Sequence, residues 1–192
     1  MAKKGDFGGI KASCPAGYTV VGLGSLTFDG NPVTTAADKL VGWRCDDNGC
    51  DAKCLGKDCR VAARCCRIKN SNSPLTCVNS RVSPLHATSA VFSPVSTCLA
   101  GLTPTSAATL QLVPNAAVGQ SEVSRVFSHI GALKVEGAGF RGRAYSFQPQ
   151  SGAETLQTTS RCCQLDCVSG SRVTVTSAQS LSAYAACPSG YT

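Results

Sequence analysis

The cysteines constrain this chain more than any other feature. There are 13 of them among 192 residues, and they are spread over the whole length. Cytosolic proteins keep their thiols reduced and use cysteine sparingly, whereas small secreted domains use disulfides to stabilise a limited core. The chain is therefore expected to occupy an oxidising compartment, either secreted or at the cell surface.

The cysteines belong to an internal repeat, which is the first pattern to look for in such a chain. A cysteine-led glycine turn occurs three times, as CPAGYT at 14–19, CLAGLT at 98–103 and CPSGYT at 187–192. An Arg-Cys-Cys triplet occurs twice, at 64–66 and 161–163. A third signature, CVNSRV at 77–82 and CVSGSRV at 167–173, precedes the second and third turns.

The order of these signatures divides the chain into modules. After a tail at 1–10, module 1 covers 11–69 and module 2 covers 74–165, with a polar linker of Asn and Ser at 70–73 between them. A third module begins at 166 and is incomplete at 192. Each complete module is long enough to bury only a modest core, so disulfides are expected to stabilise it.

The predicted fold class is all-β, with tandem small antiparallel modules stapled by disulfides. Short runs of Val, Thr, Ser and Ala alternate between Gly, Pro and Asn, as at 171–176, and no amphipathic helix is evident. The segment 123–135 has some helical spacing, but its β-branched residues and central glycine favour strands. No apolar run is long enough to cross a membrane as a helix.

The adjacent cysteines of each Arg-Cys-Cys triplet are expected to bind different partners. Neighbouring side chains of a β-strand point to opposite faces, so Cys65 and Cys66, or Cys162 and Cys163, do not readily bond to each other. In module 2 two pairings with the upstream cysteines are open. Either Cys77 bonds Cys163 and Cys98 bonds Cys162, or the partners are exchanged.

Module 1 has an additional group of four cysteines in a Gly- and Asp-rich insertion. These four are expected to form two local disulfides, with the pairing open: Cys45, Cys50, Cys54 and Cys59. Four thiolates could bind zinc or an iron–sulfur cluster, but the group lacks Cys-x₂-Cys knuckles, so no metal is predicted. The neighbouring polar residues lack the alternation of a calcium loop and are interpreted as a solvated loop: Asp46, Asp47, Asn48, Asp51 and Asp58.

The order Cys, Cys-x-x-Gly-(aromatic)-Thr, Arg-Cys-Cys resembles the modules of the cysteine-rich C-terminal domain of the proprotein convertase that drives LDL-receptor degradation. It is also similar to the C-terminal β-rich domain of apicomplexan perforin-like proteins. The resemblance implies small antiparallel β modules with nested disulfides, linking first to sixth, second to fifth and third to fourth cysteine. It implies the pairs Cys77–Cys163 and Cys98–Cys162, and module 1 is expected to follow the same plan with Cys14–Cys65. Module 2 lacks the third and fourth cysteines, and Leu102 stands near the expected third position.

Three cysteines have no partner in this scheme: Cys66, Cys167 and Cys187. We expect them to bond to cysteines outside this chain, in a following or preceding segment or in another copy. On this interpretation the chain is a segment of a longer repeat protein.

The sequence favours a non-enzymatic role without a cofactor. His86 and His129 lie in unrelated segments, and no serine has a nucleophile-elbow motif around it. The net charge of +7 is dispersed, which does not favour nucleic-acid binding. The predicted function is an extracellular interaction or structural module that binds protein partners or assembles with itself.

The alternative function is a membrane-binding appendage of a pore-forming or adhesion protein. Its candidate for an exposed apolar tip is the run Val41-Gly42-Trp43, because Trp favours membrane interfaces. Trp43 stands close to Cys45, however, and is expected instead to pack in the core against a disulfide.

Overall fold

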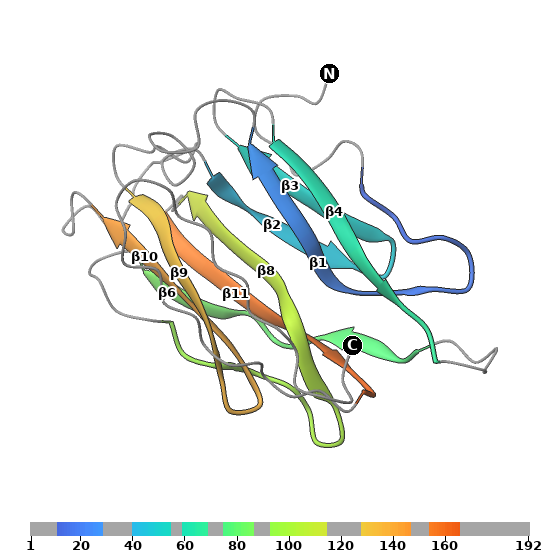
Figure 1. The fold of residues 1–192 in the computed structure, drawn as a ribbon. Helices are drawn as coiled ribbons and strands as arrows, with labels where there is room; N and C mark the ends of the chain where they lie inside the picture. The colour runs from blue at the N-terminus through green and yellow to red at the C-terminus, as the bar shows by residue number, and fades with distance from the viewer. Residues whose placement is uncertain are drawn as a thin grey trace, which may run out of the picture.

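The computed structural model describes residues 11–28, 40–54, 59–68, 75–86, 93–114, 128–146 and 154–165. Within these residues all regular structure is β-strand and all strand pairing is antiparallel, which confirms the predicted all-β class (Figure 1). The strands are β1 (Thr19–Phe28), β2 (Leu40–Asp46), β3 (Gly49–Cys54), β4 (Cys59–Cys66), β5 (Cys77–Asn79), β6 (Ser83–His86), β7 (Ser96–Thr97), β8 (Thr103–Pro114), β9 (Ser128–Glu136), β10 (Gly139–Ser146) and β11 (Glu154–Cys163).

The strands form three sheets. The largest has six strands, in the order β3-β2-β8-β11-β5 with β6 also paired to β11. β1 pairs with β4 in a two-stranded sheet, and β7, β10 and β9 form a three-stranded sheet. β9 covers the described part of the segment 123–135, so the strand prediction is confirmed there, whereas 123–127 and the predicted strand at 171–176 lie outside the described residues.

The strands that follow the two described glycine turns pair with the Arg-Cys-Cys strands in one common register. In β1–β4, Thr19 lies opposite Cys66 and Gly22 opposite Arg64. In β8–β11, Thr103 lies opposite Cys163 and Ser106 opposite Arg161. Both ladders also have two register shifts, at the same distances from the cysteine pair. The two strand pairs that carry the sequence signatures therefore share one pattern of backbone pairing.

Each module also contains a hairpin with a two-residue turn, and the two hairpins match. Asp46 lies opposite Gly49 in β2–β3, and Glu136 lies opposite Gly139 in β9–β10. Glycine is required at the start of β3 and β10, because the backbone of another residue approaches it closely. That residue lies two positions before the cysteine of the module's glycine turn. A Cβ on Gly49 would be 2.6 Å from the Ala12 carbonyl oxygen, and a Cβ on Gly139 would be 2.2 Å from that of Ser96.

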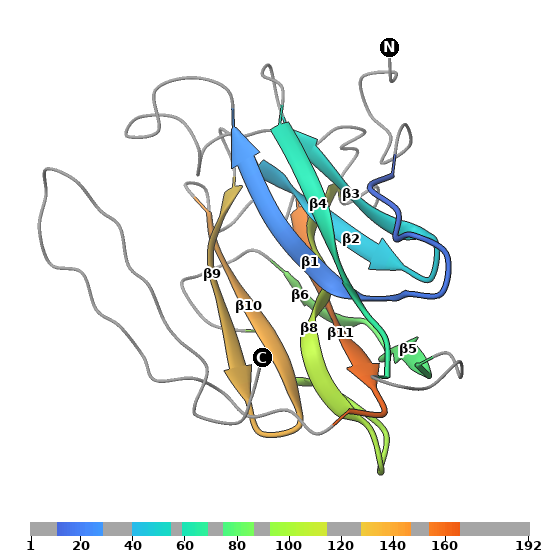
Figure 2. The ribbon, with the colours of Figure 1, turned by 45° about the vertical axis from the view of Figure 1, so that its right-hand side comes forward.

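Residues of the two modules are hydrogen-bonded within one sheet, because the hairpin of module 1 pairs with the leading strand of module 2. Gly42, Trp43 and Arg44 of β2 lie opposite Gln111, Leu110 and Thr109 of β8. The contact needs glycine in β2, since a Cβ on Gly42 would be 2.3 Å from the Leu110 carbonyl oxygen. Figure 2 shows β2 and β3 continuing the sheet that contains β8 and β11.

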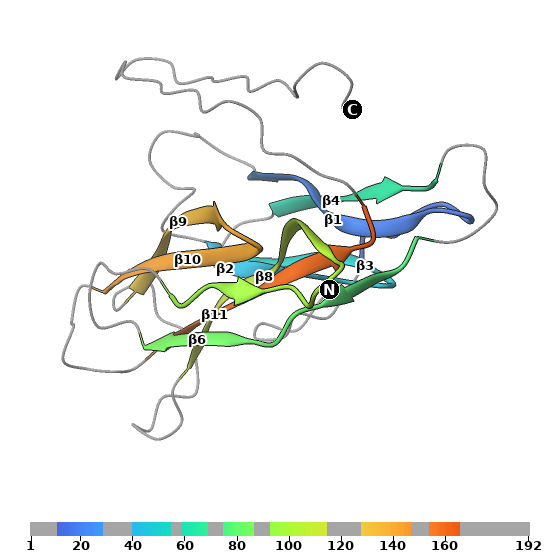
Figure 3. The same cartoon turned by 90° about the horizontal axis from the view of Figure 1, so that it is seen from below.

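The main core lies on one face of the six-stranded sheet. Val20 of β1 and Phe140 of β10 belong to the same buried cluster as Leu110 and Leu156 of that sheet. β1–β4 and β9–β10 therefore pack on the same side of it, as the view from below shows (Figure 3). Trp43 is 8% exposed and belongs to this cluster with Cys45, as the sequence predicted.

Candidate functional site

Three long-range disulfides hold the turns and strand ends of the modules. The structure contains Cys14–Cys65, Cys77–Cys163 and Cys98–Cys162. Cys14–Cys65 and Cys98–Cys162 occupy equivalent positions in the two modules, and the Cα–Cα distance is 5.6 Å in each. Neighbouring cysteines of β11 thus bond to different segments, because their side chains leave the strand on opposite faces.

The four cysteines of the module 1 insertion form two local disulfides in the structure, Cys45–Cys50 and Cys54–Cys59. Cys45 and Cys50 are a cross-strand pair of the β2–β3 hairpin, and both are buried. Cys54–Cys59 joins the end of β3 to the start of β4. The four sulfur atoms are therefore bonded in pairs and are not thiolates in this arrangement.

The matched hairpins correct the expectation about Leu102. The residues at the positions of Cys45 and Cys50 in module 2 are Val135 and Phe140, which lie opposite each other in β9–β10. Leu102 instead belongs to the turn before β8. The position of this disulfide depends on the register of the hairpin, which the sequence around the glycine turn does not contain. Phe140 is buried in the core where module 1 has the disulfide.

Cys66 has no disulfide partner in the described part of the chain and is half-buried. It packs against a second buried cluster, formed by Val21, Leu75, Cys77 and Cys163. Cys167 and Cys187, which were also expected to have partners outside the chain, lie outside the described residues.

Arg161 is the polar centre of the junction between the modules, and it is only 1% exposed. Its Nε donates to the Val20 carbonyl oxygen of β1 at 3.0 Å, and its NH1 donates to Asn79 Oδ1 at 3.0 Å. Its NH2 donates to Asp47 Oδ1 in the β2–β3 turn. One buried guanidinium thus bonds two separate parts of module 1 and a neighbouring strand of its own module, which satisfies a charge that would otherwise be costly to bury.

Further hydrogen bonds cross the same junction. Trp43 Nε1 donates to the Ala107 carbonyl oxygen at 3.3 Å, and Thr105 Oγ1 donates to that of Val21 at 2.7 Å. Asn79 Nδ2 donates to the Cys45 carbonyl oxygen at 2.9 Å. The junction therefore combines a backbone ladder, buried apolar packing and side-chain bonds to backbone carbonyls, as a stable domain interior does.

The interpretation of the acidic residues as a solvated loop is wrong for Asp46 and Asp51, which lie in β2 and β3, where basic side chains bind their carboxylates. Asp51 is buried and accepts hydrogen bonds from Arg44, from Nε to both carboxylate oxygens at 3.0 and 3.2 Å and from NH2 to Oδ2 at 3.1 Å. Asp46 accepts from Lys11 Nζ. Partial burial raises the pKa of Asp46, but the hydrogen bonds from Lys11 and the Asn48 backbone N–H outweigh it, so the pKa is lowered. Asp47 binds Arg161, and Asp58 lies outside the described residues.

A group of serines connects β11 to β10, to β7 and to the residue that follows β5. Ser160 Oγ donates to the Ser96 carbonyl oxygen and accepts from the Phe140 backbone N–H. The Ser160 backbone N–H donates to Ser80 Oγ at 2.8 Å. These hydroxyls are engaged with backbone groups, so their arrangement is structural. His86 and His129 lie in β6 and β9, but their side chains are outside the described part of the structure.

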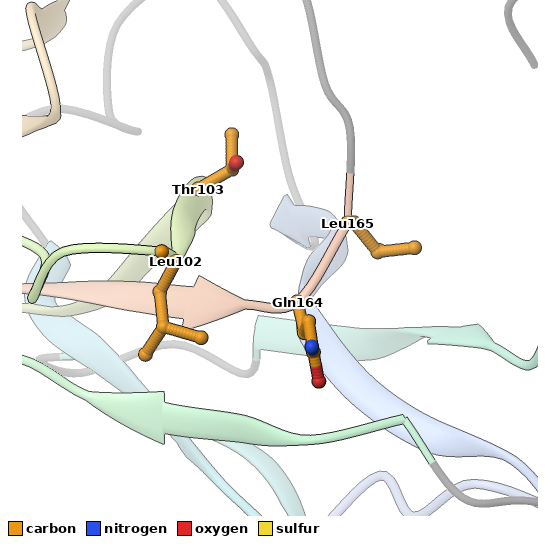
Figure 4. Close-up of a pocket in the computed structure, with 5 residues that line it drawn as sticks. Leu102, Thr103, Gln164 and Leu165 are labelled. Atoms are coloured by element: carbon orange, nitrogen blue, oxygen red, sulfur yellow. The ribbon is translucent and has the colours of Figure 1, made fainter.

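A shallow pocket lies where β8 begins and β11 ends, lined by Gly101, Leu102, Thr103, Gln164 and Leu165. Figure 4 shows that the side chains of Leu102, Thr103, Gln164 and Leu165 point in different directions. None of the lining residues has an acidic or basic side chain. The pocket therefore lacks a convergent set of polar groups of the kind that a small-molecule site uses.

Comparisons with protein-family models, curated proteins and solved structures find no match. The β-rich fold and the five disulfides among the described residues are consistent with a cysteine-rich β module. Multiple disulfides are typical of secreted and extracellular proteins. The described residues include no helix that is long and apolar enough to span a membrane.

Sequence reasoning missed the residues that join the two modules. The Arg-Cys-Cys triplet was recognised as a repeat, but nothing in it indicates that Arg161 is buried while Arg64, its equivalent, is exposed. Gly42 also gave no signal beyond its position in an apolar run. Both roles depend on contacts between segments that are far apart in the sequence.

Proposed function

We propose that this chain is a non-enzymatic interaction module of an extracellular repeat protein, in which rigid β units make contacts with protein partners or with further units. The observation that carries the proposal is the β2–β8 ladder, because it joins two equivalent units into one sheet. Disulfides at equivalent positions stabilise each unit, and such bonds persist in an oxidising environment. The resemblance to the convertase and perforin-like modules supports the same role.

The alternative, a membrane-binding appendage, has less support. Its candidate aromatic, Trp43, is buried in the core. Leu99 in the second glycine turn is 73% exposed, but a single exposed leucine is normal on soluble proteins. The proposal therefore favours a protein surface as the partner.

The test compares binding to proteins and to vesicles. The oxidised chain, immobilised at one terminus, is exposed to extracellular proteins of its source, and bound proteins are identified by cross-linking and then titrated as purified components. The same chain is mixed with zwitterionic and with anionic phospholipid vesicles in a flotation assay. We expect saturable protein binding that is lost after reduction and alkylation, and no flotation. Flotation without saturable protein binding would favour the membrane alternative and contradict the proposal.

A further inference from the structure

Two strand edges have no strand paired to them among the described residues, and the internal repeat relates them to the junction that is already formed. The leading strand β8 is bordered by β11 on one side and by β2 on the other, whereas its equivalent β1 has only β4. The hairpin strand β2 is bordered by β3 and β8, whereas its equivalent β9 has only β10. The outer edges of β1 and β9 are thus equivalent to the two edges that meet in the β2–β8 contact, but neither has a paired strand in the part of the chain that the structure describes.

Register fixes which residues would take part. Trp43 lies opposite Ala52 in the first hairpin, and Leu133 lies opposite Gly142 at the same position in the second. Leu133 is therefore the counterpart of Trp43, which lies opposite Leu110 in the β2–β8 contact. On the other edge, Leu26 is the counterpart of Leu110, since it lies opposite Val61 as Leu110 lies opposite Thr158.

Several side chains at the formed junction are buried, whereas the equivalent side chains in β9 and β4 are exposed. Trp43 is 8% exposed at the formed junction, but Leu133 is 38% exposed at the open edge. Arg161 is 1% exposed where module 1 covers it, but its equivalent Arg64 is exposed. Val135, two residues further along β9, is also exposed, whereas its counterpart Cys45 is buried. The formed junction thus buries the counterpart of each of these exposed side chains.

We infer that the outer edges of β9 and β1 are docking surfaces for one further unit of the same repeat. The leading strand of that unit pairs with β9, with its counterpart of Leu110 opposite Leu133, and its hairpin strand pairs with β1. β1 and β9 contribute to the same core on one side of the six-stranded sheet, and each unit of the repeat has one leading strand and one hairpin strand, which gives one strand for each edge. The sequence at 167–192 repeats the signatures of 77–103, which lead into β8. This inference rests on the proposed function and names one partner for it.

An extended protein tests the inference. A second copy of residues 104–165 is joined after Thr192, because 187–192 matches 98–103, and this completes a third unit. The number of free thiols checks folding: the appended copies of Cys162 and Cys163 should form disulfides with Cys187 and Cys167. Hydrogen exchange by mass spectrometry then compares the extended protein with the original chain. We expect amide exchange to slow at least about tenfold in peptides from β9 and from β1.

A matched pair of variants assigns the protection to the predicted contact. Leu133→Arg in the extended protein should restore fast exchange in β9, because it places a charge where a leucine pair is expected. Val82→Arg, at another exposed apolar side chain, should leave the protection unchanged. Equal effects of the two substitutions would contradict the predicted register.

A second measurement does not require the extension to fold. A peptide with the sequence of β8 (Thr103–Pro114) is added at millimolar concentration to the original chain, since an extended peptide can add to a sheet edge. The peptide should slow exchange in β9, and the same peptide with Leu110→Lys should not.

Absence of β9 protection in both experiments would overturn the inference, while binding to other proteins could still support the proposed function. Protection that appears in the original chain only as its concentration rises would identify a second copy as the occupant and would also overturn it.

Discussion

At the scale of single residues, the repeat allows the same residue type to be compared in two environments. Arg161 and Arg64 hold the same place in the Arg-Cys-Cys triplets, yet only Arg161 is buried and bonded to the Val20 carbonyl, Asn79 and Asp47. A buried acceptor that loses its donor is destabilised by the full cost of its desolvation. The environment, not the residue type, therefore sets the energetic importance of the arginine.

We expect Arg161→Met to lower the free energy of unfolding by about 2 kcal/mol, because it leaves the buried Val20 carbonyl without its donor. Asn79 and Asp47, by contrast, are exposed and can bond to water. The matched substitution Arg64→Met, on the exposed equivalent, should change it by no more than about 0.5 kcal/mol. Urea unfolding followed by the fluorescence of Trp43, the single tryptophan, measures both. Equal effects of the two substitutions would show that Arg161 does not stabilise the junction.

At the scale of elements, close backbone approach decides where glycine is required. Gly42 has a φ of 155° and lies against the backbone of β8, where a Cβ would be 2.3 Å from the Leu110 carbonyl oxygen. Gly101, in the second glycine turn, has a φ of 82°, but a Cβ there would have no atom within 4 Å. Both are unfavourable for a side chain through their dihedral angles, but only Gly42 also lacks space.

We expect Gly101→Ala to cost about 1 kcal/mol from its backbone conformation alone. Gly42→Ala should cost at least about 2 kcal/mol more, because β2 must move away from β8 to remove the overlap. It should also speed hydrogen exchange in both strands, whereas Gly101→Ala should not. Similar stability losses and unchanged exchange in β2 and β8 would contradict the proposed steric requirement.

At the scale of the whole molecule, the disulfides differ in how much of the unfolded chain they restrain. Cys98–Cys162 has a sequence separation of 64, whereas Cys45–Cys50 has a separation of 5. Loop closure restricts the unfolded chain more when the loop is longer. All four cysteines are buried, so their removal leaves comparable packing defects.

Replacing both Cys98 and Cys162 by alanine should therefore destabilise the chain by about 4 kcal/mol, and replacing both Cys45 and Cys50 by about 2 kcal/mol. Thermal and urea unfolding of the two double variants give the comparison. A greater loss from the short-loop pair would mean that the hairpin disulfide acts mainly through the native state.

The sequence by itself determined the all-β class, the order of the repeated signatures and the oxidised character of the chain, because these follow from local alternation, turn residues and cysteine content. The position of the hairpin pair Val135 and Phe140 was not predictable, since a strand register depends on both strands and their shifts. Only the tertiary structure decided that β2 pairs with β8, that Arg161 is buried while Arg64 is not, and which strand edges have no paired strand among the described residues. The physical reason is that equivalent residues of a repeat have the same local preferences, whereas their burial depends on which neighbouring unit covers them.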